Sequence, residues 1–333
     1  MTALPPLRYL SGDDVRAAMP PLEERLRLAE LTMTALAGDS ELPPKIGVHP
    51  RPAGSFAHAM PAFLRGAAAD GSGDGLGIKW VAGFPANDAL GLPAIHAVLI
   101  LSDPATGAPI ALLDAGPITA DRTAAVSGVA IGRFAPRGSG GRPPRVALIG
   151  HGVQGVSHLP VLAHLVPGCT LAVFGPRPPR VEAFAALART VPGIGAVEVA
   201  ATPRDAIRDA GIVITAVPFG AVDAPLTNDW LAPDALVVAL DYATYVAAEV
   251  ARDAACFVVD ERGQFVANRA AGRFDGYRDP DLTLGEAILR DVARPDRGRV
   301  LATPIGVGLA DVVFGREILA RAASLGLGLE LPR

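Results

Sequence analysis

The sequence is poor in the features on which several classes of protein depend. Its two cysteines, Cys169 and Cys256, lie beside predicted strands and match no metal-ligand spacing, so we expect buried free thiols in a reducing compartment. Charges interrupt every apolar run well short of a bilayer-spanning length. The sequence does not start with basic residues followed by an apolar stretch, so we expect no secretory signal. The formal net charge of −4 disfavours nucleic acid and anionic membranes as partners. We therefore expect a soluble, globular, cytoplasmic protein.

Three catalytic patterns are also missing. The six histidines show no metal-ligand spacing, so we expect no metal site. No Gly-x-Ser-x-Gly elbow or paired-cysteine motif occurs, which leaves hydrolase and thiol chemistry without support. At 333 residues, the chain is nevertheless long enough for two domains and a sizeable core.

A glycine-rich motif follows a short apolar stretch and reads Gly150-His151-Gly152-Val153-Gln154-Gly155. This G-x-G-x-x-G spacing, between a predicted strand and a predicted helix, is typical of dinucleotide-binding domains. The first glycine allows a tight turn, the second lets the backbone approach a phosphate, and the third lets helix pack on strand. A pyrophosphate would bind the N–H groups at the start of the helix, where the dipole is positive. A plain glycine-rich turn is the alternative, but this setting favours a dinucleotide.

The chain divides into two parts with different patterns. The first part reads as a mostly antiparallel α+β domain, because a helix around Leu22–Met33 precedes β-rich segments separated by turns. These segments are Ile46–Val48, Ile78–Phe84, Ile95–Leu101 and Ile110–Leu113. Two further helices are expected. One covers Ile118–Ala135, with Thr119 or Asp121 near its start, and the other covers Gly308–Leu325.

A Pro- and Gly-rich break at 136–144 precedes the second part, where short apolar strands alternate with helices. That pattern is typical of a parallel sheet covered on both faces. The candidate strands are Val146–Ile149, Leu171–Phe174, Val197–Ala200, Ile212–Val217, Leu236–Leu240 and Phe257–Val259. The predicted fold class is therefore α/β, a Rossmann-type doubly wound parallel sheet plus a second, α+β domain.

The end of the second of these strands bears on which nucleotide is bound. An acidic residue there often holds the adenosine ribose. The sequence has Arg177 and Arg180 in this region and no carboxylate. Because arginine pairs with a 2′-phosphate that a carboxylate would repel, we favour NADP over NAD as the cofactor. Solvated loop charges are the alternative interpretation of both arginines.

Three cationic residues lie in apolar or Gly-rich surroundings before the break. Lys79 lies inside an apolar predicted strand, where at least partial burial is expected, and a buried ammonium needs a partner or an anionic ligand. Arg122 is expected in the first turn of a helix, where it opposes the helix dipole, and Arg51 follows a strand. If the three converge they would hold a carboxylate, although each taken singly also has a structural interpretation.

Asp241 ends a predicted strand of the parallel sheet. Ligands of such sheets lie outside the carboxyl ends of the strands, so this carboxyl could reach a substrate. It would serve as a general acid or base if burial raises its pKa. Helix capping is the alternative role.

Several segments carry a resemblance to a known family. The most diagnostic one reads Ile118-Thr119-Ala120-Asp121-Arg122-Thr123-Ala124-Ala125. The others are Met60–Ala62, Gly77–Lys79, Phe84–Asn87, Gly91–Pro93, Asp103–Pro109, the glycine motif and Gly306–Asp311. Together they cover most of the chain, and in this order the sequence resembles the ornithine cyclodeaminase/mu-crystallin family.

The resemblance implies a fold and partners. It implies a Rossmann domain, residues 126–304, and a substrate-binding and dimerisation domain, residues 1–125 with 305–333 returning to it. It also implies a homodimer, a nicotinamide cofactor and a small amino or imino acid as substrate.

The resemblance further assigns roles to single residues. Arg51, Lys79 and Arg122 would hold the substrate carboxylate, with Lys79 also near the reacting nitrogen. Thr119, Arg122 and Thr123 lie where the family contacts phosphate or nicotinamide, and Thr215 lies where a loop crosses the cofactor.

The sequence departs from the family's pattern around Asp241. Anchoring the alignment on Glu249 puts the catalytic Asp of the cyclodeaminases at Ala243, so either Asp241 substitutes for it or the acid is absent. This departure favours an NAD(P)-dependent oxidoreductase, of the ketimine reductase or amino-acid dehydrogenase type, in which Lys79 and Asp241 handle protons. Ornithine cyclodeaminase is the alternative enzyme. A non-catalytic NADP-binding or accessory protein is the alternative of another class, although such a protein would not need Arg51, Lys79 and Arg122 to hold a substrate carboxylate.

Overall fold

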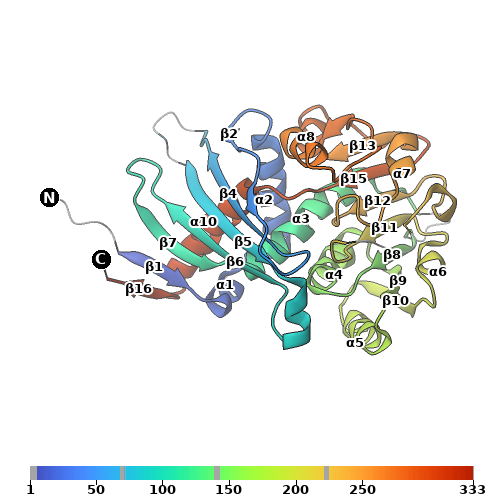
Figure 1. Cartoon of the computed structure of the whole chain (residues 1–333), viewed down its shortest axis with the longest axis horizontal. Coiled ribbons are helices and arrows are strands. Elements are labelled where there is room, and N and C mark those ends of the chain that lie inside the picture. The colour runs from blue at the N-terminus through green and yellow to red at the C-terminus, as the bar shows by residue number, and fades with distance from the viewer. Residues whose placement is uncertain (1–5, 68–70, 72, 139–142, 221–224, 333) are drawn as a thin grey trace. The chain divides into compact units, whose positions relative to one another are not determined.

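The computed structural model describes residues 6–67, 71, 73–138, 143–220 and 225–332. It divides into two compact units, one made of Met1–Arg122 with Gly306–Arg333 and the other of Thr123–Ile305 (Figure 1). The first border lies inside helix α3, Gly116–Phe134, so this helix contributes residues to both units. No helix of the described residues is long and apolar enough to cross a membrane.

The Pro- and Gly-rich break at 136–144 lies inside the second unit and not at its border, and its residues 139–142 are outside the described ones. Two hydrogen bonds connect the end of α3 to other segments of this unit. Arg133 donates to the Val292 carbonyl, and the Phe134 carbonyl accepts from Arg294. A break in the sequence pattern therefore does not mark the border between the two units.

The first unit is built on a mostly antiparallel sheet, which confirms the expected α+β pattern. The strand order is β16-β1-β7-β6-β5-β4-β2, and β3 also pairs with β4. The strands are β1 Leu7–Leu10, β2 Ser40–Glu41, β3 Ile46–Val48, β4 Phe56–Leu64, β5 Gly75–Gly83, β6 Ile95–Ser102, β7 Pro109–Asp114 and β16 Leu329–Leu331. The helices are α1 Gly12–Ala18, α2 Leu22–Ala35, the short 3₁₀ helix η1 Pro85–Leu90 and α10 Gly308–Ser324.

Strand β4 was not predicted, although it has partner strands on both sides. Its Pro61 has no N–H to donate, and proline normally indicates an edge or a non-strand segment. Here β3 pairs with residues 57–59 of β4, and β2 pairs with residues 63 and 64. Pro61 lies in the interval between the two short partners, so neither β2 nor β3 pairs with it.

Helix α10 packs closely on one face of this sheet (Figure 1). Two of its glycines allow the approach. A Cβ at Gly308 would lie 2.6 Å from the Met60 carbonyl oxygen, and one at Gly315 would lie 2.2 Å from the Leu99 side chain. The close approach brings side chains of the C-terminal helix onto strands from the first third of the chain.

The second unit is a doubly wound parallel sheet, as predicted, with strand order β10-β9-β8-β11-β12-β15-β13-β14. All six expected strands are present, and β14 and β15 are additional. The strands are β8 Val146–Ile149, β9 Cys169–Phe174, β10 Ile194–Val199, β11 Ile212–Thr215, β12 Leu236–Ala239, β13 Cys256–Val259, β14 Leu282–Thr283 and β15 Val300–Thr303. The helices are α4 Val153–Leu165, α5 Pro178–Arg189, α6 Pro203–Ile207, η2 Asn228–Trp230, α7 Ala248–Asp253, α8 Arg262–Ala270 and α9 Leu284–Leu289.

The strand order of this sheet reverses between β8 and β11, which lie side by side. Ligands of open parallel sheets bind at such a switch point, outside the carboxyl ends of the strands. The glycine motif follows β8 directly and therefore lies at the position where the fold predicts a ligand. Cys169 and Cys256 of this unit are free and buried, as expected.

Candidate active site

The three glycines of the motif have three different surroundings. Gly150 has φ of +113°, and a Cβ there would lie 2.4 Å from the Ala216 carbonyl oxygen, so the turn requires glycine. A Cβ at Gly155 would lie 2.8 Å from the Gly150 carbonyl oxygen, so this glycine lets α4 pack on the loop. No described atom lies within 4 Å of a Cβ at Gly152, which leaves the backbone there open to a phosphate.

Helix α4 begins directly after Gly152, which is its N-cap residue. Val153 and Gln154 are the first residues of the helix, so no earlier carbonyl of the helix accepts their N–H groups. Open backbone, free amide groups and a positive helix dipole together fit the pyrophosphate of a dinucleotide.

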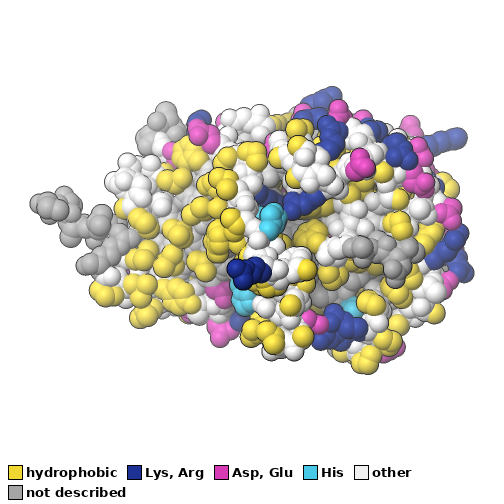
Figure 2. Space-filling view, viewed as in Figure 1, with side chains coloured by type: hydrophobic (Ala, Val, Ile, Leu, Met, Phe, Trp, Pro, Cys, Tyr) yellow, Lys and Arg dark blue, Asp and Glu magenta, His cyan; other side chains and the backbone are white. Residues whose placement is uncertain are grey.

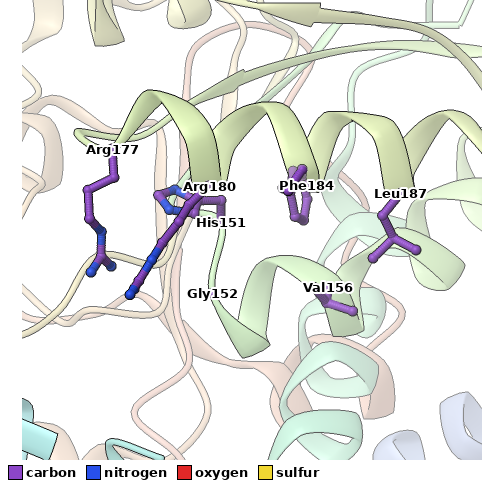
Figure 3. Close-up of a pocket in the computed structure, with 8 residues that line it drawn as sticks. His151, Gly152, Val156, Arg177, Arg180, Phe184 and Leu187 are labelled. Atoms are coloured by element: carbon purple, nitrogen blue, oxygen red, sulfur yellow. The ribbon is translucent and has the colours of Figure 1, made fainter. Parts of the chain in front are cut away.

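A pocket of about 360 Å³ opens beside this loop (Figure 3). Its lining residues are His151, Gly152, Val156, Arg177, Arg180, Ala183, Phe184 and Leu187. Arg177 and Arg180, at the start of α5, extend their guanidinium groups to the same side of that helix (Figure 3). Burial lowers the pKa of His151, and the charges of the two arginines lower it further. The pocket is therefore positively charged and suited to an anion.

The first unit holds a buried cluster of Lys79 from β5, Arg122 from α3 and Asp311 from α10. Lys79 Nζ lies 2.7 Å from Asp311 Oδ2, and Arg122 Nε donates to Asp311 Oδ1 at 3.2 Å. The Lys79 ammonium also donates to the Thr119 hydroxyl at 3.4 Å. The side chains of Lys79, Arg122 and Asp311 are 1%, 7% and 0% exposed. Two buried cations share one carboxylate, an arrangement that favours a second anion.

The electrostatics of the cluster also suit proton transfer. Burial lowers the pKa of Lys79 to about 7, although the Asp311 carboxylate opposes this shift, and the Arg122 charge adds to it. An amine that titrates near neutral pH can give or take a proton under physiological conditions. Gly306, with φ of +84°, leaves room for the guanidinium, because a Cβ there would lie 3.1 Å from Arg122 Nη1. The cluster can therefore hold an anion and move a proton.

Residues 13–265 match the model of the ornithine cyclodeaminase/mu-crystallin family. The chain belongs to this family. The nodulation efficiency protein NfeD of Rhizobium meliloti is 30% identical over 329 residues, which cover 97% of this chain and 98% of that protein. The family resemblance expected from the sequence is thus confirmed.

Two reductases are similar to this chain, one in sequence and one in fold. Delta(1)-pyrroline-2-carboxylate reductase 1 of Burkholderia multivorans is 30% identical over 253 residues, which cover 76% of this chain and 75% of that protein. The structure of the Thermococcus litoralis Delta(1)-pyrroline-2-carboxylate reductase, in complex with NADH and L-proline, has a TM-score of 0.81 and 23% identity. It covers 97% of this chain and 100% of that chain, and at this identity it shows the fold alone.

The structure brings together two of the three cations to which the family resemblance assigns the substrate carboxylate. Lys79 and Arg122 meet at Asp311, whereas Arg51 lies in the bend after β3, is exposed, and forms no ion pair with a described residue. Arg122 lies in the second turn of α3, because the helix begins at Gly116, whose N–H donates to Asp114. The expected first-turn position was therefore wrong, and the helix dipole does not disfavour this guanidinium.

The three threonines of the family pattern lie in different places. Thr119 contacts the Lys79 ammonium in the first unit. Thr123, one turn further along α3, lies just beyond the border and belongs to the second unit. Thr215 ends β11 and is fully buried. The roles of Thr119, Thr123 and Thr215 toward a cofactor stay predictions.

Asp241 follows β12 and is 1% exposed. Its Oδ2 accepts a hydrogen bond of 3.1 Å from the Val217 N–H, which ties the end of β12 to the segment after β11. Burial raises the pKa of this carboxyl to about 6, and the bond from Val217 opposes the rise. The next helix, α7, has Ala247 as its N-cap residue, so the helix-capping interpretation was wrong.

Two residues of these sites were missed in the sequence. Asp311 lies among apolar residues of a predicted helix, which indicates a buried carboxylate. Because a buried lysine needs a partner, this carboxylate was the available signal for the ion pair. His151 lies inside the glycine motif at a position that the spacing leaves open to any residue type. Asp311 contacts Lys79 and His151 lies beside Gly175, and in both cases the two residues are far apart in the sequence, so no local pattern pairs them.

Proposed function

We propose that this protein is a pyridine-nucleotide-dependent oxidoreductase that transfers hydride to or from a small amino or imino acid. The observation that carries the proposal is the cluster of Lys79, Asp311 and Arg122, which is buried and net positive when Lys79 is protonated. The carboxylate of an amino or imino acid supplies the missing negative charge. The similarity to a pyrroline-2-carboxylate reductase supports the same substrate class.

The second unit would hold the cofactor. The open backbone at Gly152 and the start of α4 fit its pyrophosphate. Arg177 and Arg180, in the positively charged pocket beside the loop, fit an adenosine 2′-phosphate and support NADP over NAD.

Reduction of a ketimine requires a hydride at the imine carbon and a proton at the nitrogen, as the C=N double bond becomes single. When bound, the nicotinamide supplies the hydride. Lys79 would donate the proton to the nitrogen, and Arg122 would orient the carboxylate through its terminal nitrogens. Asp311 holds both cations in place. Arg51 is not assigned to this carboxylate-binding group, because its side chain is exposed.

Cyclodeamination is a second candidate, favoured by one observation. Asp241 lies at the carboxyl end of β12, and burial raises the pKa of its carboxyl to about 6, a value suited to proton exchange with an amine. An acid that engages the side-chain amine of a diamino acid is what a cyclodeaminase needs. Asp241 is also the candidate for a second proton carrier in a reductase.

Direct assays separate these functions. Purified protein is titrated with NADPH and with NADH, read by fluorescence quenching and energy transfer. NADPH consumption is then followed with cyclic and linear ketimine carboxylates, in parallel with ammonia release from ornithine and lysine. We expect tight NADPH binding and reduction of a ketimine. Ammonia release without net NADPH oxidation would favour cyclodeamination, and nucleotide binding without either reaction would favour an accessory protein.

The first unit also supports a homodimer. Ile46, Val48, Trp80 and Val98 lie on the sheet face opposite Lys79 and α10, as the strand register requires, and are 67%, 57%, 48% and 44% exposed. Figure 2 shows hydrophobic side chains gathered over the strands of this unit. An exposed apolar sheet face of this kind is suited to an isologous contact with a second copy. Trp80→Glu should convert a dimer to monomers, as measured by light scattering, and an unchanged mass would remove this face from the interface.

A further inference from the structure

The His151 ring occupies the space that a side chain at position 175 would need. Gly175 follows β9 directly, and a Cβ there would lie 2.1 Å from His151 Nδ1 and 2.5 Å from its Cε1. Gly175 is not among the glycines with positive φ, so its backbone conformation is open to other residues. Val181 Cγ2 lies 3.1 Å from the same Cβ, so the imidazole is the main obstacle to a side chain at this position.

Position 175 is where dinucleotide-binding domains often carry an acid. A carboxylate at the end of the second strand accepts hydrogen bonds from the ribose hydroxyls of NAD and repels the 2′-phosphate of NADP. In this chain a neutral or cationic ring takes the place of that carboxylate. One residue of the glycine motif thus changes the chemistry at the end of the neighbouring strand.

The two ring nitrogens of His151 also point to a ligand. Both are shielded from solvent, and neither forms a hydrogen bond with a residue that the structure describes. Buried polar atoms are normally paired, and leaving them unpaired is costly. The same ring lines the pocket into which Arg177 and Arg180 extend (Figure 3), so an anion held by the arginines would lie beside a further donor.

We propose that His151 and Gly175 form a pair that determines the nucleotide preference of this protein. The imidazole displaces the ribose-binding carboxylate and donates a hydrogen bond to the adenosine 2′-phosphate, beside the guanidinium groups of Arg177 and Arg180. The inference rests on the proposed function and adds a specificity-determining residue, His151, to the nucleotide site.

The first test compares His151→Ala with His164→Ala, a control in which an exposed histidine of α4, outside the pocket lining, is removed. Affinities for NADPH and NADH are measured by fluorescence titration. Loss of a hydrogen bond to a charged phosphate should weaken NADPH binding about ten-fold and leave NADH binding unchanged in His151→Ala. His164→Ala should leave both affinities as in the wild type.

Adenosine 2′,5′-bisphosphate and adenosine 5′-monophosphate provide a readout that needs neither nicotinamide nor turnover. His151→Ala should weaken binding of the bisphosphate and leave the monophosphate unaffected. A role in shaping the loop alone would weaken both nucleotides equally, which would overturn the proposal. Unchanged affinity for the bisphosphate would overturn it as well.

A gain of NADH affinity tests the claim that the His151 ring excludes a carboxylate at position 175. In the double variant His151→Ala/Gly175→Asp the ring is gone and the carboxylate has room. The ratio of NADPH to NADH affinity should fall by more than about ten-fold, with tighter NADH binding than in His151→Ala alone. NADH binding no tighter than in that single variant would refute the displacement. If the wild-type protein binds neither dinucleotide, the proposed function itself fails. That outcome differs from one in which the wild type binds a dinucleotide and the variants keep its nucleotide preference.

Discussion

Lys79 on β5 and Asp311 on α10 form an ion pair of 2.7 Å that solvent hardly reaches. Burial lowers the pKa of the ammonium and the Asp311 carboxylate opposes the fall, which leaves a pKa of about 7. Arg122 shares the same carboxylate, so the cluster contains more positive than negative groups.

Replacing Lys79 by Met should reduce kcat/KM for a ketimine carboxylate by roughly a hundred- to ten-thousand-fold, the range expected for loss of a general acid. NADPH affinity should be unchanged, because the glycine motif, Arg177 and Arg180 lie in the second unit and Lys79 is not among the predicted cofactor contacts. Steady-state kinetics and a nucleotide titration measure both quantities. The control is Lys45→Arg, which changes the only other lysine of the chain and keeps its charge, because the Lys45 charge contributes to the lowered pKa of Lys79. Full activity of Lys79→Met would contradict the assignment of the proton donor.

The titration of Lys79 can be measured directly, because isotope-labelled lysine would give only two side-chain signals, and Lys45→Arg assigns them. We expect the NMR signal of Lys79 to titrate at about pH 7. In Asp311→Asn the pKa should fall further, because the carboxylate that favours the ammonium is gone, and in Arg122→Met it should rise, because a neighbouring cation is gone. Shifts of the same sign in both variants would contradict this arrangement of charges.

Asp241→Asn should stabilise the protein at neutral pH. Burial raises the pKa of the folded-state carboxyl from 3.8 to about 6, so the folded state binds the proton more tightly than the unfolded chain. The free energy of unfolding then falls as pH rises from about 4 to about 6, by up to ~3 kcal/mol. An amide avoids this cost and can still accept the hydrogen bond from Val217. Urea unfolding should show a gain of about 1–3 kcal/mol at neutral pH that disappears toward pH 4.

The same variant tests catalysis. If Asp241 carries a proton, Asp241→Asn loses turnover and keeps nucleotide affinity, whereas a purely structural role leaves kcat unchanged. Turnover and stability are therefore measured on one preparation of this variant.

His158 on α4 should produce the opposite dependence on pH. It is fully buried, its Nδ1 lies 2.6 Å from the Gln154 carbonyl oxygen, and burial lowers its pKa from 6.5 to about 4. The unfolded chain binds this proton first, so stability is present above about pH 6.5 and is lost as pH falls toward 4, by up to ~3 kcal/mol. In His158→Leu the free energy of unfolding should depend less steeply on pH over this range. Urea unfolding at several pH values measures the slope, and an unchanged slope would contradict the prediction.

Local patterns were sufficient for much of the fold. Strands such as Ile212–Thr215 are continuous apolar runs, and the three glycines of the motif have the spacing that a phosphate-binding turn requires. The burial of Lys79 also followed from its apolar strand neighbours.

Features that depend on distant parts of the chain were not visible in the sequence. β4 contains a proline, which lies in the interval between the two short strands on one of its sides. The start of α3 is set by Asp114 and not by Thr119 or Asp121. Asp311 joins Lys79, and His151 fills the space beside Gly175, through contacts between separate segments that no periodicity encodes.

The first unit contains the two ends of the described chain, with α10 as the last helix to be synthesised. On the ribosome, the strands that carry Lys79 emerge long before the helix that carries Asp311. The whole second unit is translated in the interval, so the nucleotide-binding residues are complete while the Lys79 strand still lacks its carboxylate partner. A chain that ends prematurely before α10 would retain every residue of the nucleotide pocket but not the counterion of Lys79 and Arg122. Full-length translation is thereby a condition for the charge arrangement on which the proposed chemistry depends.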